Sequence, residues 1–418
     1  MGEDARAPMS LTSLRSALFL ATALLSASPA RALIIYGTGP TDLNNALNTT
    51  APASGAPWLN VVQLGVNNAS GIYLGNGYIL TANHVAPLPG TVTINGLLYT
   101  VDPAFAPLQI IDGATVVDMK LLKILGIPDG NGTRVLPPLP VVQKLPLNYS
   151  TTVPTTDLNL ACTIIGWGVG KDSIVPNQGW YWGDDSTRAE RWGTNKTLST
   201  AVTATYSGYS YEALETSFKR SLGSNTSEIT LGDSGSGLFQ QFAGVWKLSG
   251  LTTTVLQYLG GAALYDGDTS ILAPGDQPDA ANFVRIARYA HLLRYENWAN
   301  LKLGSPTAVV TADTDKDGSN NLLEYAFHTE PGTASVSTLP QVGMESGYLT
   351  LTYTQLLTAT DLSYVVEESP SLSPAAWSPA TVIEETVSTT SVTRVVKAKV
   401  ATAGATAKYL RLNVTKTP

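Results

Sequence analysis

Short apolar segments, separated by turns that contain glycine or asparagine, fill most of the chain between residues 33 and 303. Residues 71–80 are typical, because two apolar runs flank Gly75-Asn76-Gly77 and predict a β-hairpin. Residues 116–124, 162–166 and 244–253 share this strand-like pattern. Charged residues make up only 14% of the chain, and sustained helical periodicity is rare. The sequence therefore predicts a mainly β fold.

One segment departs from that pattern. Between residues 281 and 303, apolar side chains recur at intervals of three and four, as in Phe283, Ile286, Ala290 and Leu293. This spacing places them on one face and predicts an amphipathic helix.

The N-terminal segment has the parts of an export signal. Arg15 is positively charged, residues 17–25 are apolar, and Ala30-Arg31-Ala32 matches a small-x-small cleavage site. The apolar run is shorter than the about 20 residues that a membrane span requires, and no other stretch is apolar for long enough. We therefore expect a signal peptide over 1–32, and a secreted protein, extracellular or periplasmic, with no membrane span.

Charge and cysteine content restrict the partners and the means of stabilisation. The formal net charge is −7 and no basic patch of useful length occurs, which argues against nucleic acid as a partner. The only cysteine, Cys162, excludes an intramolecular disulfide. It lies in an apolar run, so we interpret it as a buried apolar residue rather than a reactive thiol.

A glycine-rich string contains the best candidate nucleophile. In Gly232-Asp233-Ser234-Gly235-Ser236-Gly237, the glycines around Ser234 permit a tight turn and the close approach of a substrate carbonyl. The amides of Gly232 and Ser234 could then point together as an oxyanion hole. Taken alone, the string is equally compatible with a plain Gly/Ser turn. It does not fit Gly-x-Ser-x-Gly, because Ser236 stands two residues after Ser234.

A serine nucleophile needs a base, and the chain has only 3 histidines. His84 directly follows the second predicted strand of the hairpin and so lies at the rim of a core. His291 falls within the predicted helix and His328 follows an acidic loop, where structural or surface roles are favoured. A lone His84 would also be structural more often than catalytic, but its context favours catalysis.

Three motifs occur in the order His, Asp, Ser. They are Thr81-Ala-Asn-His84, Asp118-Met-Lys-Leu-Leu-Lys-Ile124 and Gly232-Asp-Ser-Gly235. Together they resemble the Thr-Ala-Ala-His, Asp-x-Ala-Leu-Leu-x-Leu and Gly-Asp-Ser-Gly motifs of the trypsin/chymotrypsin family of serine proteases. Weaker likenesses around Pro57-Trp58, Gly166-Trp167-Gly168 and the segment 283–289 extend the resemblance over most of residues 33–304.

The resemblance implies a chymotrypsin-like double antiparallel β-barrel with a C-terminal helix, and a serine endopeptidase that hydrolyses proteins or peptides. By the same resemblance, Ser234 is the nucleophile, His84 the general base and Asp118 the carboxylate that orients His84. The oxyanion hole would be formed by the amides of Gly232 and Ser234. This chemistry needs no cofactor.

The resemblance also implies roles for two further acids. Glu228, six residues before Ser234, would lie at the floor of the primary specificity pocket and favour Lys or Arg in the substrate. The residues around it do not match the family, so a solvent-facing Glu228 is the alternative. Asp233 would pair with the N-terminal amine that signal removal releases near Leu33-Ile34.

Residues 313–324 fit the twelve-residue calcium-loop pattern. Gly318 permits the sharp turn, and a solvated acidic turn is the alternative. The run resembles dockerin-like or thrombospondin type 3-like calcium segments of secreted bacterial proteins, so we expect a structural Ca²⁺ and a bacterial source. The expected ligands are Asp313, Asp315, Asp317, Ser319 through its carbonyl, Asn321 and Glu324.

These features divide the chain into a signal peptide (1–32), a protease domain (33–304), a calcium-loop linker (305–335) and a small β-sandwich-like module (336–418). The module would attach the protein to a cell surface or matrix, or only protect the C-terminus. The alternative function is a catalytically silent, calcium-dependent surface-binding or adhesion protein on the same fold. Retention of all three triad residues favours the enzyme.

Overall fold

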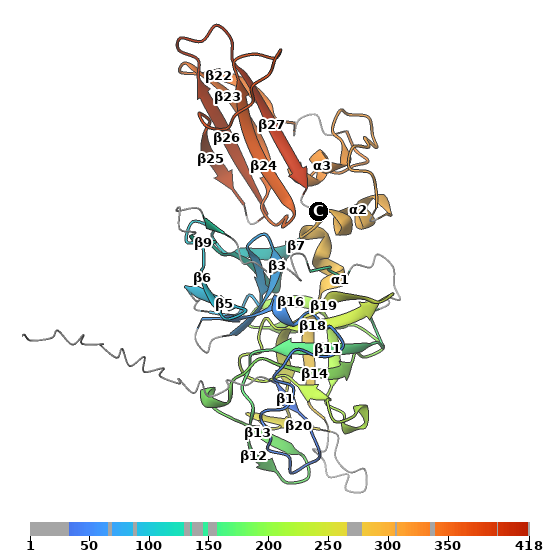
Figure 1. Cartoon of the computed structure of the whole chain (residues 1–418). Coiled ribbons are helices and arrows are strands. Elements are labelled where there is room, and N and C mark those ends of the chain that lie inside the picture. The colour runs from blue at the N-terminus through green and yellow to red at the C-terminus, as the bar shows by residue number, and fades with distance from the viewer. Residues whose placement is uncertain are drawn as a thin grey trace, which may run out of the picture.

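Figure 1 shows the computed structural model of the chain, in which the first large sheet lies between the second large sheet and the C-terminal strands. The structure describes residues 33–65, 69–86, 90–128, 134–135, 145–148, 157–265, 278–305, 307–334, 339–390 and 392–416. The predicted signal peptide lies outside the described residues. No described helix has both the length and the apolar character that crossing a bilayer requires.

The first seven-stranded antiparallel sheet has the strand order β6-β5-β2-β3-β4-β8-β7. A bridge between Val101 and Ile124, and a hydrogen bond of 2.9 Å from the Leu125 amide to the Thr100 carbonyl, join the end of β6 to β8. These contacts close a barrel and leave β7 outside it. The strands are β2 (Val61–Leu64), β3 (Ala69–Gly75), β4 (Tyr78–Thr81), β5 (Thr91–Ile94), β6 (Leu97–Thr100), β7 (Leu108–Asp112) and β8 (Thr115–Lys123).

The second seven-stranded antiparallel sheet has the order β14-β11-β18-β19-β21-β16-β15. A bridge between Thr197 and Thr216, and a hydrogen bond of 2.9 Å from the Leu198 amide to the Glu215 carbonyl, join the end of β14 to β16. They close a second barrel, with β15 outside. The strands are β11 (Ala161–Gly166), β14 (Arg191–Lys196), β15 (Val202–Tyr206), β16 (Tyr209–Ser217), β18 (Gly237–Phe242), β19 (Val245–Leu256) and β21 (Ala280–Arg285).

Three apolar clusters explain why these strands close as they do. One cluster, which includes Leu122, fills the first barrel. Another, which includes Leu238, fills the second barrel. The largest cluster joins both sheets, with Leu121 from β8 and Tyr211 from β16. The chain is therefore mainly β and carries the double antiparallel barrel that the sequence resemblance implied.

The hairpin expected over residues 71–80 is confirmed as β3 and β4. Its turn places Asn76 at φ 52° and Gly77 at φ 80°, a left-handed conformation that asparagine and glycine adopt most readily.

The helix predicted over residues 281–303 is wrong in its first part. Residues 281–285 belong to β21, a central strand between β19 and β16. A strand covered on both faces is apolar throughout, and periodicity alone does not separate such a short run from a buried helix. Helical structure begins only at α1 (Ile286–Tyr289), passes through a 3-10 turn at Ala290–Leu292 and ends with α2 (Tyr295–Leu303).

After α2, the chain forms α3 (Asn321–Phe327) and two antiparallel sheets that pack through Leu351, Val366 and Ala398. A separate apolar cluster joins Trp298 of α2 to Tyr325 of α3 and to Leu356. The Asn76 side chain, in the β3–β4 turn of the first barrel, donates to the Thr360 carbonyl at 3.0 Å and so contacts this region. The strands are β22 (Gln341–Glu345), β23 (Tyr348–Leu356), β25 (Ile383–Thr389) and β26 (Thr393–Ala401) in one sheet, and β24 (Leu362–Ser369) and β27 (Tyr409–Lys416) in the other.

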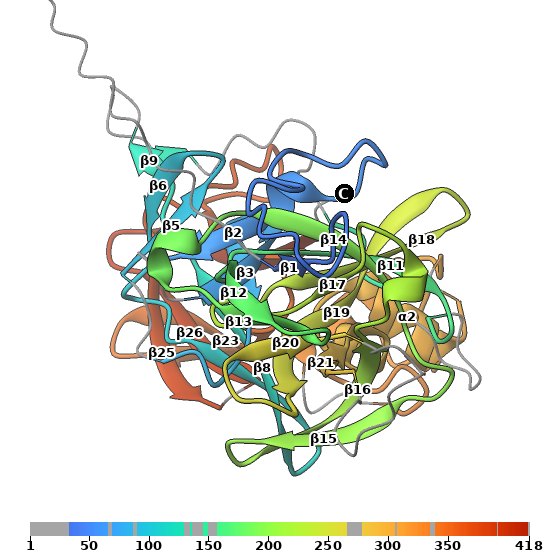
Figure 2. The same cartoon turned by 90° about the horizontal axis from the view of Figure 1, so that it is seen from below.

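Smaller sheets complete the described structure. They are β1 (Ile34–Ile35) with β17 (Ser227–Glu228), β12 (Lys171–Val175) with β13 (Gly179–Trp182) and β20 (Ala262–Leu264), and β9 (Ile127–Pro128) with β10 (Arg134–Val135). Figure 1 shows β12, β13 and β20 at the end of the second barrel that lies away from the first barrel, and Figure 2 views them from below.

Candidate active site

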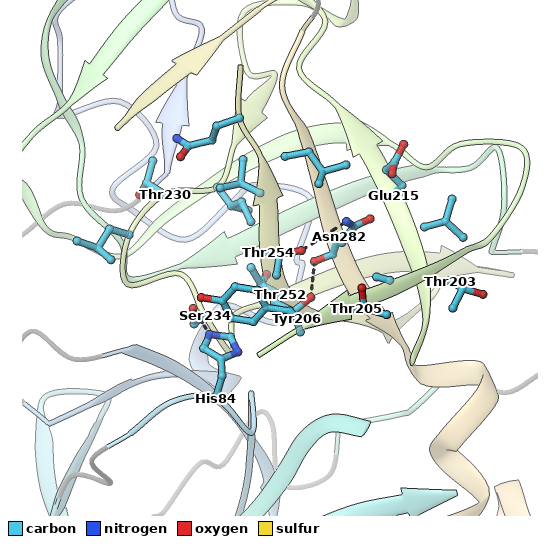
Figure 3. Close-up of a pocket in the computed structure, with 18 of the residues that line it drawn as sticks. His84, Thr203, Thr205, Tyr206, Glu215, Thr230, Ser234, Thr252, Thr254 and Asn282 are labelled. Carbon is cyan, nitrogen blue, oxygen red and sulfur yellow. Dashed lines mark hydrogen bonds between the residues drawn. The ribbon is translucent and has the colours of Figure 1, made fainter. Parts of the chain in front are cut away.

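Three side chains from distant parts of the sequence meet between the barrels. His84 follows β4, Asp118 lies within β8, and Ser234 lies in the turn between β17 and β18. The His84 Nε2 lies 2.8 Å from the Ser234 Oγ, and the His84 Nδ1 lies 2.7 Å from the Asp118 Oδ2. Figure 3 shows the imidazole directed at Ser234. The arrangement is that of a nucleophile, a base and an orienting carboxylate.

Asp118 holds His84 at two points. Its Oδ2 faces the imidazole, and its Oδ1 accepts a hydrogen bond of 2.9 Å from the His84 backbone amide. Asp118 is fully buried, whereas the His84 side chain is 14% exposed on the side of the cleft. With its proton on Nδ1, the imidazole leaves Nε2 as the acceptor for the Ser234 hydroxyl proton.

The turn around Ser234 is held to the first barrel. The Ser234 carbonyl accepts from the Ser70 amide at 2.9 Å, and the Gly232 carbonyl accepts from the Ser70 hydroxyl at 3.0 Å. Gly235 has φ 83°, and a Cβ there would lie 2.3 Å from the Ser70 carbonyl oxygen, so the position requires glycine.

The predicted oxyanion donors lie in this same turn. Gly232 has φ 94°. Within the described part of the chain, no acceptor takes the amide hydrogen of Gly232 or of Ser234. Both donors therefore stay available beside the Ser234 hydroxyl, as stabilisation of an oxyanion would require.

Asp233 is fully buried beside the nucleophile candidate. Its carboxylate accepts from the Gly168 amide at 2.8 Å and from the Thr230 amide at 2.8 Å. Burial raises the pKa of Asp233 to about 6. The segment that would carry the predicted amine is close by, because Ile34 pairs with Glu228 in the register of β1 and β17. The pairing itself stays a prediction, since residues before Leu33 lie outside the described chain.

Glu228 is buried, which excludes the solvent-facing alternative. Its Oε1 accepts from the Ile229 amide at 2.9 Å, while its Oε2 has no partner in the described structure. Burial, and then the nearby Asp279 and Asp233 carboxylates, raise the pKa of Glu228 well above its usual range. Glu228 is not among the residues that line the cleft cavity. This position offers a substrate no carboxylate, contrary to the role that the resemblance implied.

Relative to the wild type, Glu228→Gln should become progressively more stable as the pH rises above about 5. The folded pKa lies above the unfolded value, so the wild type takes up protons on folding and loses stability with rising pH. Glutamine removes that loss, by up to about 1.4 kcal/mol per pH unit. Urea unfolding of both proteins across this range measures the difference. A difference that stays constant with pH would show that Glu228 is ionised in the folded protein.

A cavity of about 620 Å³ adjoins the triad. His84 and Ser234 lie at one side, and most of the remaining lining comes from residues 202–206 of β15 and 252–257 on and after β19. Tyr206, at the tip of the β15–β16 hairpin, packs edge-on against His84, with ring centroids 4.9 Å apart.

Sequence reasoning missed Tyr206 because its contact with His84 joins segments that are far apart in the sequence. The only local signal is the hairpin turn itself, where Ser207 has φ 51° and Gly208 has φ 88°. That signal predicts the hairpin and not the surface onto which it folds.

The other histidines and the cysteine lie away from the triad. Burial lowers the pKa of His291 to about 4, and His328 ends α3 in a left-handed conformation with φ 59°. Neither histidine lines the cavity. Cys162 is buried, and burial raises the pKa of its thiol.

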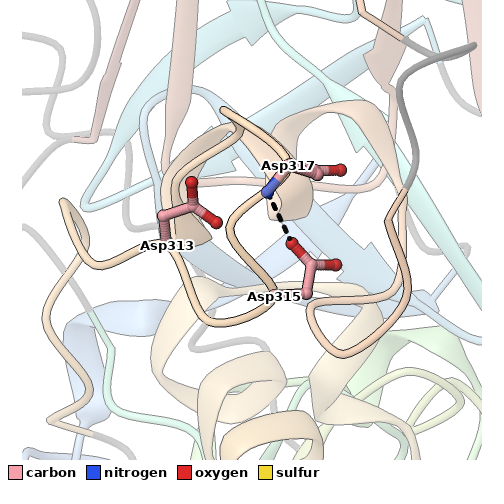
Figure 4. A group of neighbouring side chains, drawn as sticks. All are labelled: Asp313, Asp315 and Asp317. Carbon is pink, nitrogen blue, oxygen red and sulfur yellow. Dashed lines mark hydrogen bonds between the residues drawn. The ribbon is translucent and has the colours of Figure 1, made fainter.

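The predicted calcium loop brings three of its carboxylates together. Oxygens of Asp313, Asp315 and Asp317 lie within 4.8 Å of one another. Figure 4 shows the three around the turn, where the Asp317 amide donates to the Asp315 side chain at 3.2 Å. Gly318 provides the turn with φ 96°.

The other predicted ligands are placed differently. Glu324, on α3, is fully buried, and both of its carboxylate oxygens lack a partner in the described structure. Burial, then repulsion from Asp315 and the other loop acids, raises the pKa of Glu324 to about 7. The Asn321 Nδ2 donates to the Val309 carbonyl at 2.9 Å, and its Oδ1 accepts from the Thr314 hydroxyl at 3.1 Å, so both polar atoms of this side chain are already engaged. Ser319 is buried.

No family model matches the chain, and no curated protein matches it. Among solved structures, an inactive form of a serine-to-alanine mutant of Rv3671c from M. tuberculosis aligns with a TM-score of 0.33 at 12% identity, over 61% of this chain and 93% of that chain. Kallikrein-related peptidase 10 in complex with Zn²⁺ aligns with a TM-score of 0.34 at 16% identity, over 60% and 97%. A double mutant of human heparin binding protein aligns with 0.35 at 16% identity, over 63% and 98%. These values are low, so the double barrel is defined by the sheets and closing bridges of this chain.

Proposed function

We propose that the protein is a serine endopeptidase that cleaves peptide bonds through an acyl-enzyme intermediate. The observation that carries the proposal is the chain of contacts from Asp118 to His84 at 2.7 Å and from His84 to Ser234 at 2.8 Å. Two free amides beside the nucleophile support it. No comparable observation favours a catalytically silent protein.

The proposed cycle follows from this geometry. The Ser234 Oγ attacks the scissile carbonyl carbon as its proton passes to the His84 Nε2, and Asp118 stabilises the imidazolium. The amides of Gly232 and Ser234 bind the oxyanion. The C–N bond then breaks as His84 gives its proton to the leaving amine. Water repeats the sequence on the acyl-enzyme and releases the acid.

The edge of β19 supports a peptide substrate. Beyond Thr252, β19 pairs with β21 on one side only, and no described strand covers its other edge. Residues 252–257 at this edge line the cavity next to Ser234. An extended peptide can add to an open edge as a further strand, which gives affinity through main-chain hydrogen bonds.

Labelling with a fluorescent fluorophosphonate tests the nucleophile. The wild type and Ser236→Ala should be labelled, whereas Ser234→Ala should not. Ser236 is a matched control, because it lies two residues away but is fully buried, with its Oγ 2.5 Å from the Thr252 Oγ1. Equal labelling of Ser234→Ala would reject Ser234, and an unlabelled, folded wild type would favour the silent binding protein.

We also propose that residues 313–324 hold a structural Ca²⁺. The buried Glu324 carboxylate, with two unpartnered oxygens, supports this assignment over a solvated turn. Calcium accepts such a bidentate carboxylate together with the oxygens of Asp313, Asp315 and Asp317. The ion would neutralise the loop beside α3, whose Tyr325 packs with Trp298 of α2.

Saturating Ca²⁺ should raise the midpoint of thermal unfolding by roughly 5 °C or more, because binding at one hundred times Kd contributes about 2.7 kcal/mol. The shift should disappear in Glu324→Gln. Glu330→Gln is the matched control, since Glu330 is exposed and pairs with Lys302. Calorimetry with EGTA or Ca²⁺ measures the shift. An equal shift in wild type and Glu324→Gln would place the ion elsewhere.

We also propose that the protein is exported and that its C-terminal strands form a module that attaches it to a cell surface or matrix. Signal removal after Ala32 would expose the amine of Leu33, directly before the pairing of Ile34 with Glu228 of β17. Sequencing of the active mature protein from its N-terminus tests this, and a start well beyond Ile35 would exclude the pairing with Asp233.

A further inference from the structure

Among the described residues that line the cleft cavity, Glu215 alone carries a formal negative charge. It lies on β16 and is partly buried. Burial raises the pKa of its carboxyl, and no hydrogen bond or cation in the described structure offsets that effect. The carboxylate therefore faces the cavity without a counter-charge.

The strand direction explains why Glu215 faces the cavity. Leu214, the preceding residue, packs in the core of the second barrel. Because successive side chains of a strand point to opposite faces, Glu215 points outward. Its cross-strand partner on β21 is Asn282, and the partner of Asn282 on β19 is Thr254. Figure 3 shows this polar row, with Ser234 at the opposite end of the group from Glu215.

Asn282 provides a second acceptor in the row. Its side chain is 4% exposed, and its Nδ2 donates to the Thr254 Oγ1 at 3.4 Å. Its Oδ1 is buried and has no partner in the described structure. A buried acceptor without a donor is costly, and here it lines the same cavity as the uncompensated carboxylate of Glu215.

We infer that Glu215 and Asn282 form a subsite for a Lys or Arg side chain of the peptide substrate, at a position removed from the cleaved bond. The inference rests on the proposed endopeptidase function and names its substrate class. An ammonium or guanidinium group supplies both the positive charge and several N–H donors, so it can satisfy both acceptors. An acidic side chain would be repelled, and a neutral donor would leave the charge uncompensated.

This assignment differs from the one that the sequence suggested. Glu228 does not line the cavity, so it offers the substrate no charge there. Glu215 follows no motif in the sequence, and only the pairing of β16 with β21 brings it to the cleft.

A quenched fluorescent peptide with one variable residue tests the subsite. Lys, Arg, Gln or Glu is placed at successive positions on both sides of the cleaved bond, and kcat/KM is measured. The wild type should prefer Lys or Arg over Gln about tenfold at one position away from the bond. Glu215→Gln should lose this preference, and Glu215→Lys should favour Glu there. The preference should weaken with added salt.

Asp172→Asn is the charge-matched control, because Asp172 is exposed on β12 and does not line the cavity, and it should retain the preference. Fluorophosphonate labelling of each variant confirms an assembled triad. A wild type that cleaves without a basic preference, or a preference that survives in a labelled Glu215→Gln, overturns the subsite and leaves the protease. A wild type that neither labels nor cleaves overturns both.

Discussion

Ser234→Ala should lower kcat for peptide hydrolysis by roughly a millionfold, the largest effect that we expect from any single change. Alanine removes the atom that attacks the carbonyl, and His84 then has no hydroxyl at 2.8 Å to deprotonate. Rate enhancement above the uncatalysed reaction should persist at roughly a thousandfold, because the oxyanion donors and the binding edge remain.

The double variant Ser234→Ala/His84→Ala should be no slower than Ser234→Ala alone, because residues that act as a unit are not additive. Single-turnover assays with a fluorogenic peptide at high enzyme concentration measure both variants. Equal thermal unfolding midpoints serve as the folding control. A Ser234→Ala variant with more than about a hundredth of wild-type kcat would reject the acyl-enzyme route.

Asp118→Asn should lower kcat by roughly ten thousandfold at neutral pH while preserving the fold. The Oδ1 of the new amide can still accept from the His84 backbone amide, so the imidazole keeps its place. The Nδ2 of the new asparagine faces the His84 Nδ1 and donates an N–H to it. In the wild type this place is taken by the Asp118 Oδ2, which lies 2.7 Å from Nδ1. The imidazole must then carry its proton on Nε2, where it cannot accept the proton of Ser234.

Steady-state kinetics and unfolding of Asp118→Asn and Asp102→Asn measure this effect. Asp102 is a partly exposed acid next to the same barrel whose carboxylate accepts from the Ala104 amide, and its replacement should leave kcat within about twofold of wild type. A loss in Asp118→Asn of less than about a hundredfold would mean that His84 is held in its tautomer by another group.

The parts of the fold that depend on local chemistry were predictable. The turn at Asn76 and Gly77 requires a left-handed backbone, so its residues identify the hairpin of β3 and β4. The tight turn around Ser234 was likewise predictable from its glycines, because Gly235 has φ 83° and lies against the Ser70 carbonyl. The short apolar strands predicted the mainly β class, which the structure confirms.

Prediction from local sequence patterns was wrong where burial of a strand on both faces removes the periodic signal. Residues 281–285 were predicted as the start of a helix but form the central strand β21, in which successive side chains are buried on both faces. The role predicted for Glu228, at the floor of a specificity pocket, was also wrong. Glu228 stands six residues before Ser234, as the resemblance requires. Its side chain is nevertheless buried, and its Oε1 accepts a hydrogen bond from the neighbouring Ile229 amide.

By itself, the sequence determined the chemistry that the chain carries: a serine between glycines, a histidine after a buried strand, an acid within another strand, and an acidic loop of calcium-binding spacing. Each is a local choice of residue type and backbone conformation. Tertiary structure alone decided which side chains meet across the cleft. Long-range strand pairing sets the distance from His84 to Ser234 and places Tyr206 against His84. It also directs Glu215 toward the cavity. Such contacts join residues far apart in the chain, and no local pattern encodes them.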